Sequence, residues 1–197
     1  MQQKNFRIND KGEISREDYL FLSAKEDNSQ PLPTNRKVWK IILLGILTFG
    51  IYNIVITFAA AKETNITCAE DGKTTRGFWG AVGLSIVTLG LYAYIWWWKW
   101  IDREYNFLEK NSTDGGIITG ARYFIITLMI VLLQLASNFL PAFISPQYNP
   151  DTYLSYFGCI VSLVVTLSII LATKWIKQHN AVNKIYNLKS FGKFLRK

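Results

Sequence analysis

The stretch RKVWKIILLGILTFGIYNIVITF, residues 36–58, is answered forty positions later by RGFWGAVGLSIVTLGLYAYIWWW, residues 76–98. The two copies align without a gap and share seven pairs: Arg36/Arg76, Trp39/Trp79, Leu44/Leu84, Ile46/Ile86, Thr48/Thr88, Gly50/Gly90 and Tyr52/Tyr92. Apolar composition alone can match leucine and isoleucine. It does not easily place Arg, Trp and a Thr-x-Gly-x-Tyr motif at one common offset. We therefore interpret the two stretches as an internal repeat.

The apolar residues of the 197-residue chain gather in four blocks that are nearly without charged side chains. A helix needs about 20 such residues to cross the hydrocarbon layer of a bilayer. We expect an all-α, polytopic integral membrane protein with four transmembrane helices, at residues 38–61, 78–101, 123–144 and 154–177. The expected domains are a cytoplasmic N-terminal tail (1–37), the transmembrane domain (38–178) and a basic amphipathic C-terminal tail (179–197).

Lysine and arginine residues near the span ends predict the orientation, because cytoplasmic loops carry an excess of them. Twelve lie on the side of the two termini, and three lie in the opposite loops, namely Lys62, Lys73 and Arg76. Both termini are therefore expected in the cytoplasm. The net charge of +8 flanks the spans instead of forming one patch, so anionic lipid of the inner leaflet is the expected partner and nucleic acid is not.

Consecutive spans run in opposite directions, so the two copies are expected as an inverted repeat about an axis in the membrane plane. Arg36 would then lie at the inner surface and Arg76 at the outer surface. The alternative is a hairpin bent at each motif glycine, which would leave both copies on one side. We favour the inverted repeat because unsatisfied backbone groups are costly in lipid.

Small residues on one helix face let a neighbouring helix approach closely. We expect helix packing at Gly45, Gly50, Tyr52, Gly80, Gly83, Gly90 and Tyr92. Indoles prefer the headgroup region, and lysines at helix ends reach toward it. We expect the membrane interface at Trp39, Trp79, Trp96, Trp97, Trp98, Trp100, Lys174 and Lys177. An aromatic ligand-binding site is the open alternative for the run of tryptophans at residues 96–100.

Polar side chains within the last two spans form a candidate path. Gln134 and Asn138 are four residues apart and therefore share a helix face. Ser162 and Thr166 belong to a stripe of hydroxyl side chains in the fourth span. Packing against another helix is the simpler interpretation of this stripe, and a hydrated groove is the alternative.

The sequence contains no pattern that points to catalysis, a cofactor or a metal. Ionisable residues inside spans usually mark membrane enzymes and carriers, and the expected spans have no Asp, Glu, Lys or Arg apart from lysines near their ends. His179 is the only histidine and follows the last span, so no histidine-based metal cluster or triad is possible. Cys68 and Cys159 are too few for a disulfide framework and are expected as free thiols, although a bond between them stays open.

The doubled motif resembles the bacterial membrane family called domain of unknown function 4234. The matching residues are Arg36, Thr48, Gly50, Ile51 and Tyr52 in the first copy, and Thr88, Gly90, Leu91, Tyr92 and Trp96 in the second. Ile56 stands where the second copy has Trp96, and Asn53 replaces the usual glycine. The likeness covers residues 36–106 and implies a bacterial inner-membrane protein. It implies no reaction, because the family has no established activity.

These observations leave three hypotheses for function. The first is a non-enzymatic scaffold or accessory subunit that packs with membrane partners or with itself as a homo-oligomer. The second is a pore or small transporter lined by the polar residues of the last two spans. The third is an interfacial enzyme acting on lipid through Asp102, Glu104 or His179, and the scarcity of clustered ionisable groups argues against it.

Overall fold

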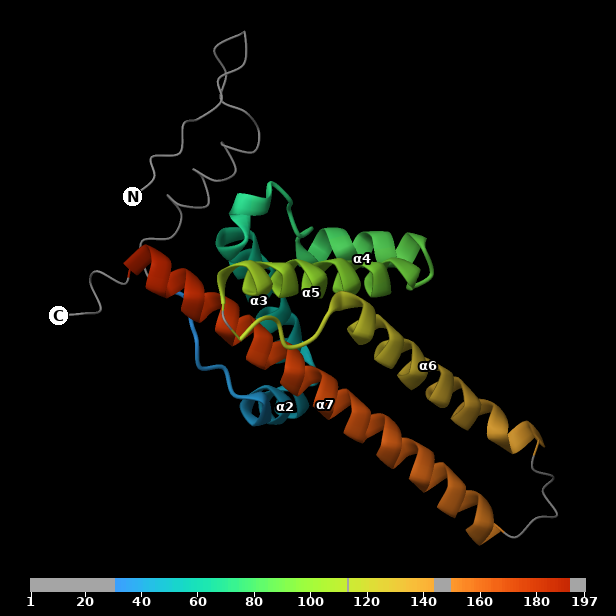
Figure 1. Cartoon of the computed structure of the whole chain (residues 1–197). Coiled ribbons are helices and arrows are strands. Elements are labelled where there is room, and N and C mark those ends of the chain that lie inside the picture. Colours follow the sequence, from blue (N-terminus) through green and yellow to red (C-terminus); the bar gives the residue numbers. More distant parts are fainter. Residues whose placement is uncertain (1–30, 113, 144–149, 192–197) are drawn as a thin grey trace.

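The structure, a computed structural model, describes residues 31–112, 114–143 and 150–191 (Figure 1). Most of the expected N-terminal tail and the last six residues lie outside this range. The described residues form α-helices, one short 3-10 helix and no strand, which confirms the all-helical class. The α-helices are α2 (Val38–Leu47), α3 (Ile51–Thr67), α4 (Phe78–Val87), α5 (Leu91–Asn111), α6 (Gly120–Phe143) and α7 (Pro150–Phe191), and the 3-10 helix is η1 (Ala69–Asp71).

The first two apolar blocks are not continuous helices. Each is divided at its Thr-x-Gly motif into two helices that fold back on each other, α2 with α3 and α4 with α5 (Figure 1). We call these pairs hairpin 1 and hairpin 2. Among the helices of the described residues, α6 and α7 are the two that are long and apolar enough to cross a membrane. The expectation of four spans is therefore not confirmed, and the bent hairpin that we considered less favourable is the observed geometry.

The Thr-x-Gly-x-Tyr motif forms the same turn in both hairpins. In hairpin 1 the Thr48 hydroxyl donates to the Leu44 carbonyl at 2.6 Å and accepts from the Tyr52 backbone N–H at 3.0 Å. One side chain thus ends the first helix and caps the next. Thr88 makes the corresponding bonds with Leu84 (2.8 Å) and Tyr92 (3.0 Å).

Glycine is required in the turn because the backbone is left-handed there. The φ angles are 86° at Gly50 and 91° at Gly90, a region that side chains with a Cβ atom disfavour. The preceding residues, Phe49 and Leu89, also have positive φ angles, 50° and 51°. The motif therefore encodes a reversal of the chain.

The turn leaves none of its own N–H groups without an acceptor, so the cost of unsatisfied backbone that we expected for a hairpin in lipid does not arise at these groups. Along residues 48–52 every backbone N–H donates to a carbonyl or to the Thr48 hydroxyl, including a 2.7 Å bond from Gly50 N–H to the Gly45 carbonyl. The same set recurs along residues 88–92. An irregular segment with internal partners avoids the cost that lipid imposes on free donors.

Helices α6 and α7 lie side by side and extend well beyond the hairpins (Figure 1). Their apolar side chains are mostly exposed, as expected for residues that face lipid. Helix α7 has 42 residues, and at about 1.5 Å per residue it is much longer than the roughly 30 Å hydrocarbon layer. It continues without a break through the boundary that we expected between residues 178 and 179.

The C-terminal part of α7 packs against both hairpins and forms the core with them. Trp175 and Ile176 of α7 join Trp96, Trp100 and Ile101 of α5 in one buried cluster. Val182 is fully buried in a second cluster with Leu108 and Cys68. The apolar face that we expected on an amphipathic surface helix is thus partly used to hold α7 on α5.

Candidate functional site

Four ionisable side chains from four segments meet in the interior, and we call them the charge cluster. Arg36 precedes α2, Glu63 lies on α3, Glu104 on α5 and His179 on α7. Glu104 and His179 are fully buried, and Glu63 is only 8% exposed. The charge cluster therefore joins both hairpins to the long helix.

His179 stands between the two carboxylates. Its Nδ1 lies 2.7 Å from Glu104 Oε1 and its Nε2 lies 3.0 Å from Glu63 Oε2. A neutral imidazole has only one N–H, so its second nitrogen would turn a lone pair toward a carboxylate oxygen. A protonated ring donates to both oxygens, and this geometry therefore holds His179 as an imidazolium ion. Such a ring has no lone pair left for a metal.

Arg36 forms a two-pronged ion pair with Glu63. Its Nη1 donates to Glu63 Oε2 at 2.7 Å, and its Nη2 donates to Oε1. Burial by itself raises the pKa of Glu63. Hydrogen bonds from His179 and Arg36, together with their positive charges, outweigh burial and lower the pKa from 4.5 to about 2. The two carboxylates thus balance two cations, as burial of charge demands.

Glu104 is held by hydrogen-bond donors from three elements. Its Oε1 accepts from the Thr64 hydroxyl at 2.8 Å and from Trp100 Nε1 at 2.9 Å, in addition to His179. Its Oε2 is buried without a protein partner. Because an ionised carboxylate is costly to bury, these three donors are needed to keep Glu104 in place.

Asparagines on one face of α7 hold the chain that leads into hairpin 1. Asn187 donates to the Leu32 carbonyl and accepts from the Leu32 N–H, both at 2.8 Å. Asn180 makes the same pair of bonds with the backbone of Arg36, at 2.9 and 3.2 Å. Asn183 donates to the Pro33 carbonyl at 2.8 Å. The three amides hydrogen-bond to the backbone of the segment before α2, and they thereby fix the position at which Arg36 enters the charge cluster.

Arg103 holds the connection between the two hairpins in place through hydrogen bonds and an ion pair. Its guanidinium forms a fork on Asp71, with Nε–Oδ2 at 2.6 Å and Nη2–Oδ1 at 2.8 Å. The remaining N–H groups donate to Asn65 Oδ1, Thr75 Oγ1 and the Cys68 carbonyl. All the donors of Arg103 are therefore occupied, and the segment from η1 to α4 is tied to α5.

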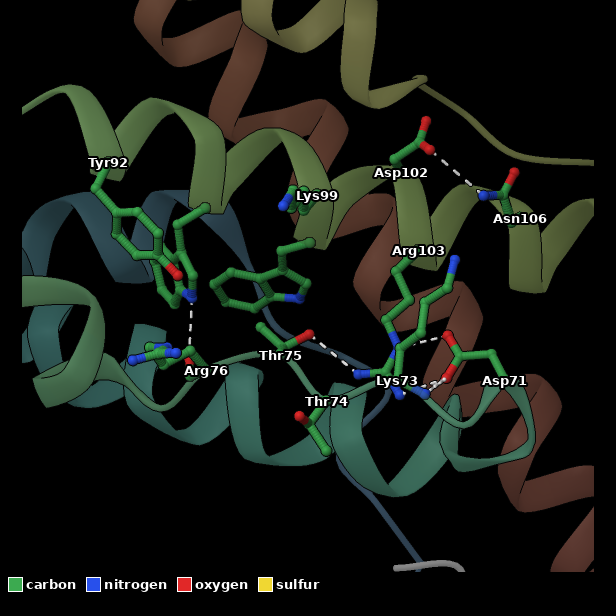
Figure 2. A pocket seen from close by; sticks show the side chains of 12 residues that line it. Asp71, Lys73, Thr74, Thr75, Arg76, Tyr92, Lys99, Asp102, Arg103 and Asn106 are labelled. Atoms are coloured by element: carbon green, nitrogen blue, oxygen red, sulfur yellow. Dashed lines mark hydrogen bonds and ion pairs between the residues drawn. The ribbon is translucent and has the colours of Figure 1, made fainter. Parts of the chain in front are cut away.

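A pocket of about 600 Å³ lies between that segment and α5 (Figure 2). One wall is the loop before α4, with Lys73 and Arg76. The other is α5, with Trp96, Lys99 and Trp100. We call it the α5 pocket, and it combines aromatic surface with positive charge.

The residues expected at helix-packing positions have different structural roles. A Cβ atom at Gly45 would lie 2.6 Å from the Asn53 side chain, so this glycine lets α2 approach α3. Gly50 and Gly90 have open space around them and serve the turns. Gly83 also has open space, and a Cβ atom at Gly80 would meet the Arg76 side chain at 3.0 Å. The tyrosines of the motif, Tyr52 and Tyr92, are half-buried.

The tryptophans expected at the interface are divided between surface and interior. Trp39 and Trp79 are mostly exposed, and Trp98 is partly exposed. Trp96 and Trp100 are buried, and Trp97 stacks on Trp100 with ring centroids 4.9 Å apart. The end of the aromatic run is therefore core. Lys174 and Lys177 are exposed on α7, just after its apolar part.

Three of the four residues expected on the polar path lie on helices that the structure describes with their side chains. Gln134, Ser162 and Thr166 are exposed on the outer faces of α6 and α7. The Thr166 hydroxyl donates to the Ser162 carbonyl of its own helix at 2.8 Å. The side chain of Asn138 lies outside the described residues. Both cysteines are free thiols, with Cys68 buried and Cys159 exposed.

The sequence interpretation missed the charge cluster because its members are far apart in the chain. Glu104 and His179 were considered only as members of a loose interfacial site, and Glu63 was not considered. One signal was present: Thr64 and Glu104 are separated by forty residues, the offset of the repeat. In the described part of the chain, no group of three His, Cys, Asp or Glu side chains is arranged to hold a metal ion.

Comparison with known proteins supports the resemblance over residues 36–77. No curated protein and no solved structure matches the chain. A family model matches residues 36–77, which comprise hairpin 1 and the connection to hairpin 2. This range is shorter than the expected 36–106. Over residues 36–77 the chain thus matches the family described as Domain of unknown function (DUF4234).

Proposed function

We propose that this protein is a non-enzymatic membrane scaffold whose two hairpins enter one leaflet while α6 and α7 cross the bilayer. The observation that carries the proposal is the contact between Arg36 and Glu63, at the two ends of hairpin 1. Residues that share an ion pair lie on the same side of a membrane. Hairpin 1 therefore enters and leaves from one side.

The exposed apolar turns support insertion of the hairpins into lipid. Phe49 is 98% exposed and Leu89 is 94% exposed, and each is flanked by other exposed apolar residues. A ten-residue helix such as α2 or α4 is about 15 Å long, which is about half of the roughly 30 Å hydrocarbon layer. Hairpins of this length reach the middle of the bilayer and return.

The distribution of basic residues supports the same topology. With hairpins in place of spans, Lys62, Lys73 and Arg76 join the termini on one side. The opposite side then has only the connection between α6 and α7, which contains no lysine or arginine. This is a stronger positive-inside bias than four spans would produce, and it favours cytoplasmic termini. A bacterial inner membrane with anionic inner-leaflet lipid fits this arrangement.

A scaffold also explains why the ionisable residues are buried in pairs. The charge cluster and the Arg103 fork each connect segments that would otherwise be independent. Buried ion pairs are a costly way to gain stability, and their attested use is to specify one arrangement of elements. The arrangement specified here is two apolar turns held at fixed positions beside two spans. We infer that partners, or a second copy of the chain, pack on this rigid unit.

Site-directed cysteine labelling tests the topology. Lys37→Cys, Glu70→Cys and Lys73→Cys, each in a Cys159→Ala background, are exposed to a membrane-impermeant maleimide. We expect labelling in inverted vesicles and none in intact cells for all three. Four spans would place positions 70 and 73 outside, so their labelling in intact cells would refute the proposal.

Two controls make the result unambiguous. Ser145→Cys, between α6 and α7, should be labelled in intact cells and shows that the reagent reaches the outer surface. Phe49→Cys and Leu89→Cys should resist the reagent from both sides, because lipid surrounds the turns. Labelling of either turn from the aqueous phase would show that the hairpins lie outside the bilayer.

A further inference from the structure

The α5 pocket carries positive charge that the protein itself does not neutralise. The Arg103–Asp71 pair at its floor is internally balanced, and Arg103 has no donor left. Lys73, Arg76 and Lys99 line the pocket as exposed side chains, and their charged ends make no hydrogen bond or ion pair within the described residues. The pocket therefore has three free cations.

The one other carboxylate in the pocket faces away from these cations. Asp102 Oδ1 accepts from the Gly120 N–H at 3.3 Å, at the start of α6. Its Oδ2 accepts from Asn106 Nδ2 at 3.4 Å, as Figure 2 shows. Three cations and one carboxylate leave a net charge of +2, which favours an anion with several oxygen acceptors, such as a phosphate ester.

The pocket also has an apolar side, which inorganic phosphate would not use. Trp96 and Trp100 of α5 line the pocket. Tyr92 lies at the end nearest the apolar turn of hairpin 2 (Figure 2). From Tyr92 to Asn106 the pocket follows fourteen residues of α5, or about 21 Å. It thus runs from the part of hairpin 2 that we place in lipid to the part that we place in water.

We propose that the α5 pocket binds the headgroup of an anionic phospholipid, with the anionic headgroup held by the basic side chains Lys73, Arg76 and Lys99 and its apolar part against the tryptophans that line the pocket. Its volume lies within the roughly 300–1,000 Å³ range of small-ligand sites. This inference rests on the proposed topology, which sets hairpin 2 at the cytoplasmic headgroup level. It adds a defined lipid site to the general attraction of basic residues for the inner leaflet.

Native mass spectrometry of the full chain in detergent, titrated with phosphatidylglycerol or phosphatidylcholine, tests the site. We expect one tightly held phosphatidylglycerol and a weaker phosphatidylcholine adduct. The triple variant Lys73→Gln, Arg76→Gln, Lys99→Gln should bind the first phosphatidylglycerol about a hundredfold more weakly, since each basic residue near anionic lipid contributes about fivefold.

The matched control is Lys37→Gln, Lys110→Gln, Lys184→Gln, which removes the same charge from exposed positions outside the pocket. It should keep the tight phosphatidylglycerol. An equal loss in both triple variants would mean diffuse attraction and would overturn the proposal. Displacement of the lipid by millimolar inorganic phosphate would do so too, because the site would then be one for a free anion.

The outcome separates this inference from the proposed function. If labelling places residues 37, 70 and 73 in the cytoplasm but phosphatidylglycerol shows no preference, the lipid site is refuted and the scaffold topology stands. If residues 70 and 73 are labelled from outside, the topology is refuted. A tight lipid lost only in the pocket variant would then still identify the α5 pocket as an anionic-lipid site, in the other leaflet.

Discussion

The hydroxyl of Thr64 donates a hydrogen bond to Glu104 Oε1 at 2.8 Å, and these two residues are forty positions apart, the same offset as the two Thr-x-Gly-x-Tyr motifs. The sequence identity between the copies ends before these residues. The burial pattern nevertheless continues, because Ala60, Ala61 and Thr64 are buried and so are Trp100, Ile101 and Glu104. Faces of α3 and α5 that lie at the same distance from their motifs thus meet each other.

Loss of one partner of the Arg36–Glu63 pair should destabilise the fold strongly. Glu63→Gln leaves Arg36 without its carboxylate and the two cations with Glu104 alone, and removing one partner of a buried pair costs about 3–5 kcal/mol. Thermal unfolding of the purified protein in detergent measures the effect. Arg36→Gln with Glu63→Gln should cost less than the two single losses added together. Strict additivity would show that the two side chains do not interact.

The motif glycine should tolerate no side chain. Gly50→Ala forces a Cβ atom into left-handed backbone and should cost about 1–2 kcal/mol. Gly83→Ala is the matched control, since it lies within a helix and has open space around it. That change should be neutral or stabilise the protein by up to about 1 kcal/mol. Equal thermal shifts for both variants would contradict the assigned turn.

The threonine of the motif should act through its hydroxyl. Thr48→Val keeps the shape but leaves the Tyr52 N–H without its acceptor, and loss of such a cap costs about 1 kcal/mol. Thr48→Ser keeps the hydroxyl and should be milder, as should Thr57→Val on the exposed face of α3. Unfolding temperatures of the three variants rank these effects. A Thr48→Val protein as stable as the parent would exclude the capping role.

Stability should fall in acid because of Glu63. Its pKa is about 2 in the folded protein against an ordinary 4.5, so the folded state holds its carboxylate ionised. The contribution is complete above pH 4.5 and is lost as the pH falls toward 2. Unfolding measured across this window should show a steeper decline for the parent than for Glu63→Gln. Parallel curves would remove Glu63 as the cause.

The asparagines of α7 should control access to the chain before hairpin 1. Asn187→Leu removes both bonds to the backbone of Leu32, and we expect limited proteolysis near residues 31–35 to become several times faster. Lys184→Leu, at an exposed position of the same helix, is the control and should leave the cleavage rate unchanged. Cleavage at an equal rate in both variants would show that Asn187 does not hold this segment.

The sequence alone determined the helical class, the apolar character of α6 and α7 and the two copies of the Thr-x-Gly-x-Tyr motif. Composition and periodicity report these features, because each depends on residues close together in the chain. The sequence also pointed to the family model that matches residues 36–77. It could not settle whether the motif lies inside a straight span or at a turn, because glycine is common in both.

Only the tertiary structure decided that the two apolar blocks are hairpins and that His179 is a buried partner of two carboxylates. The contact between Glu63 and His179 joins residues 116 positions apart, and no local sequence pattern indicates such a pair. The charge cluster brings both ends of hairpin 1 to one place through the pair Arg36–Glu63. The physical reason is that a buried carboxylate needs its cations within hydrogen-bond reach, so the pairing of charges dictates how the chain must turn.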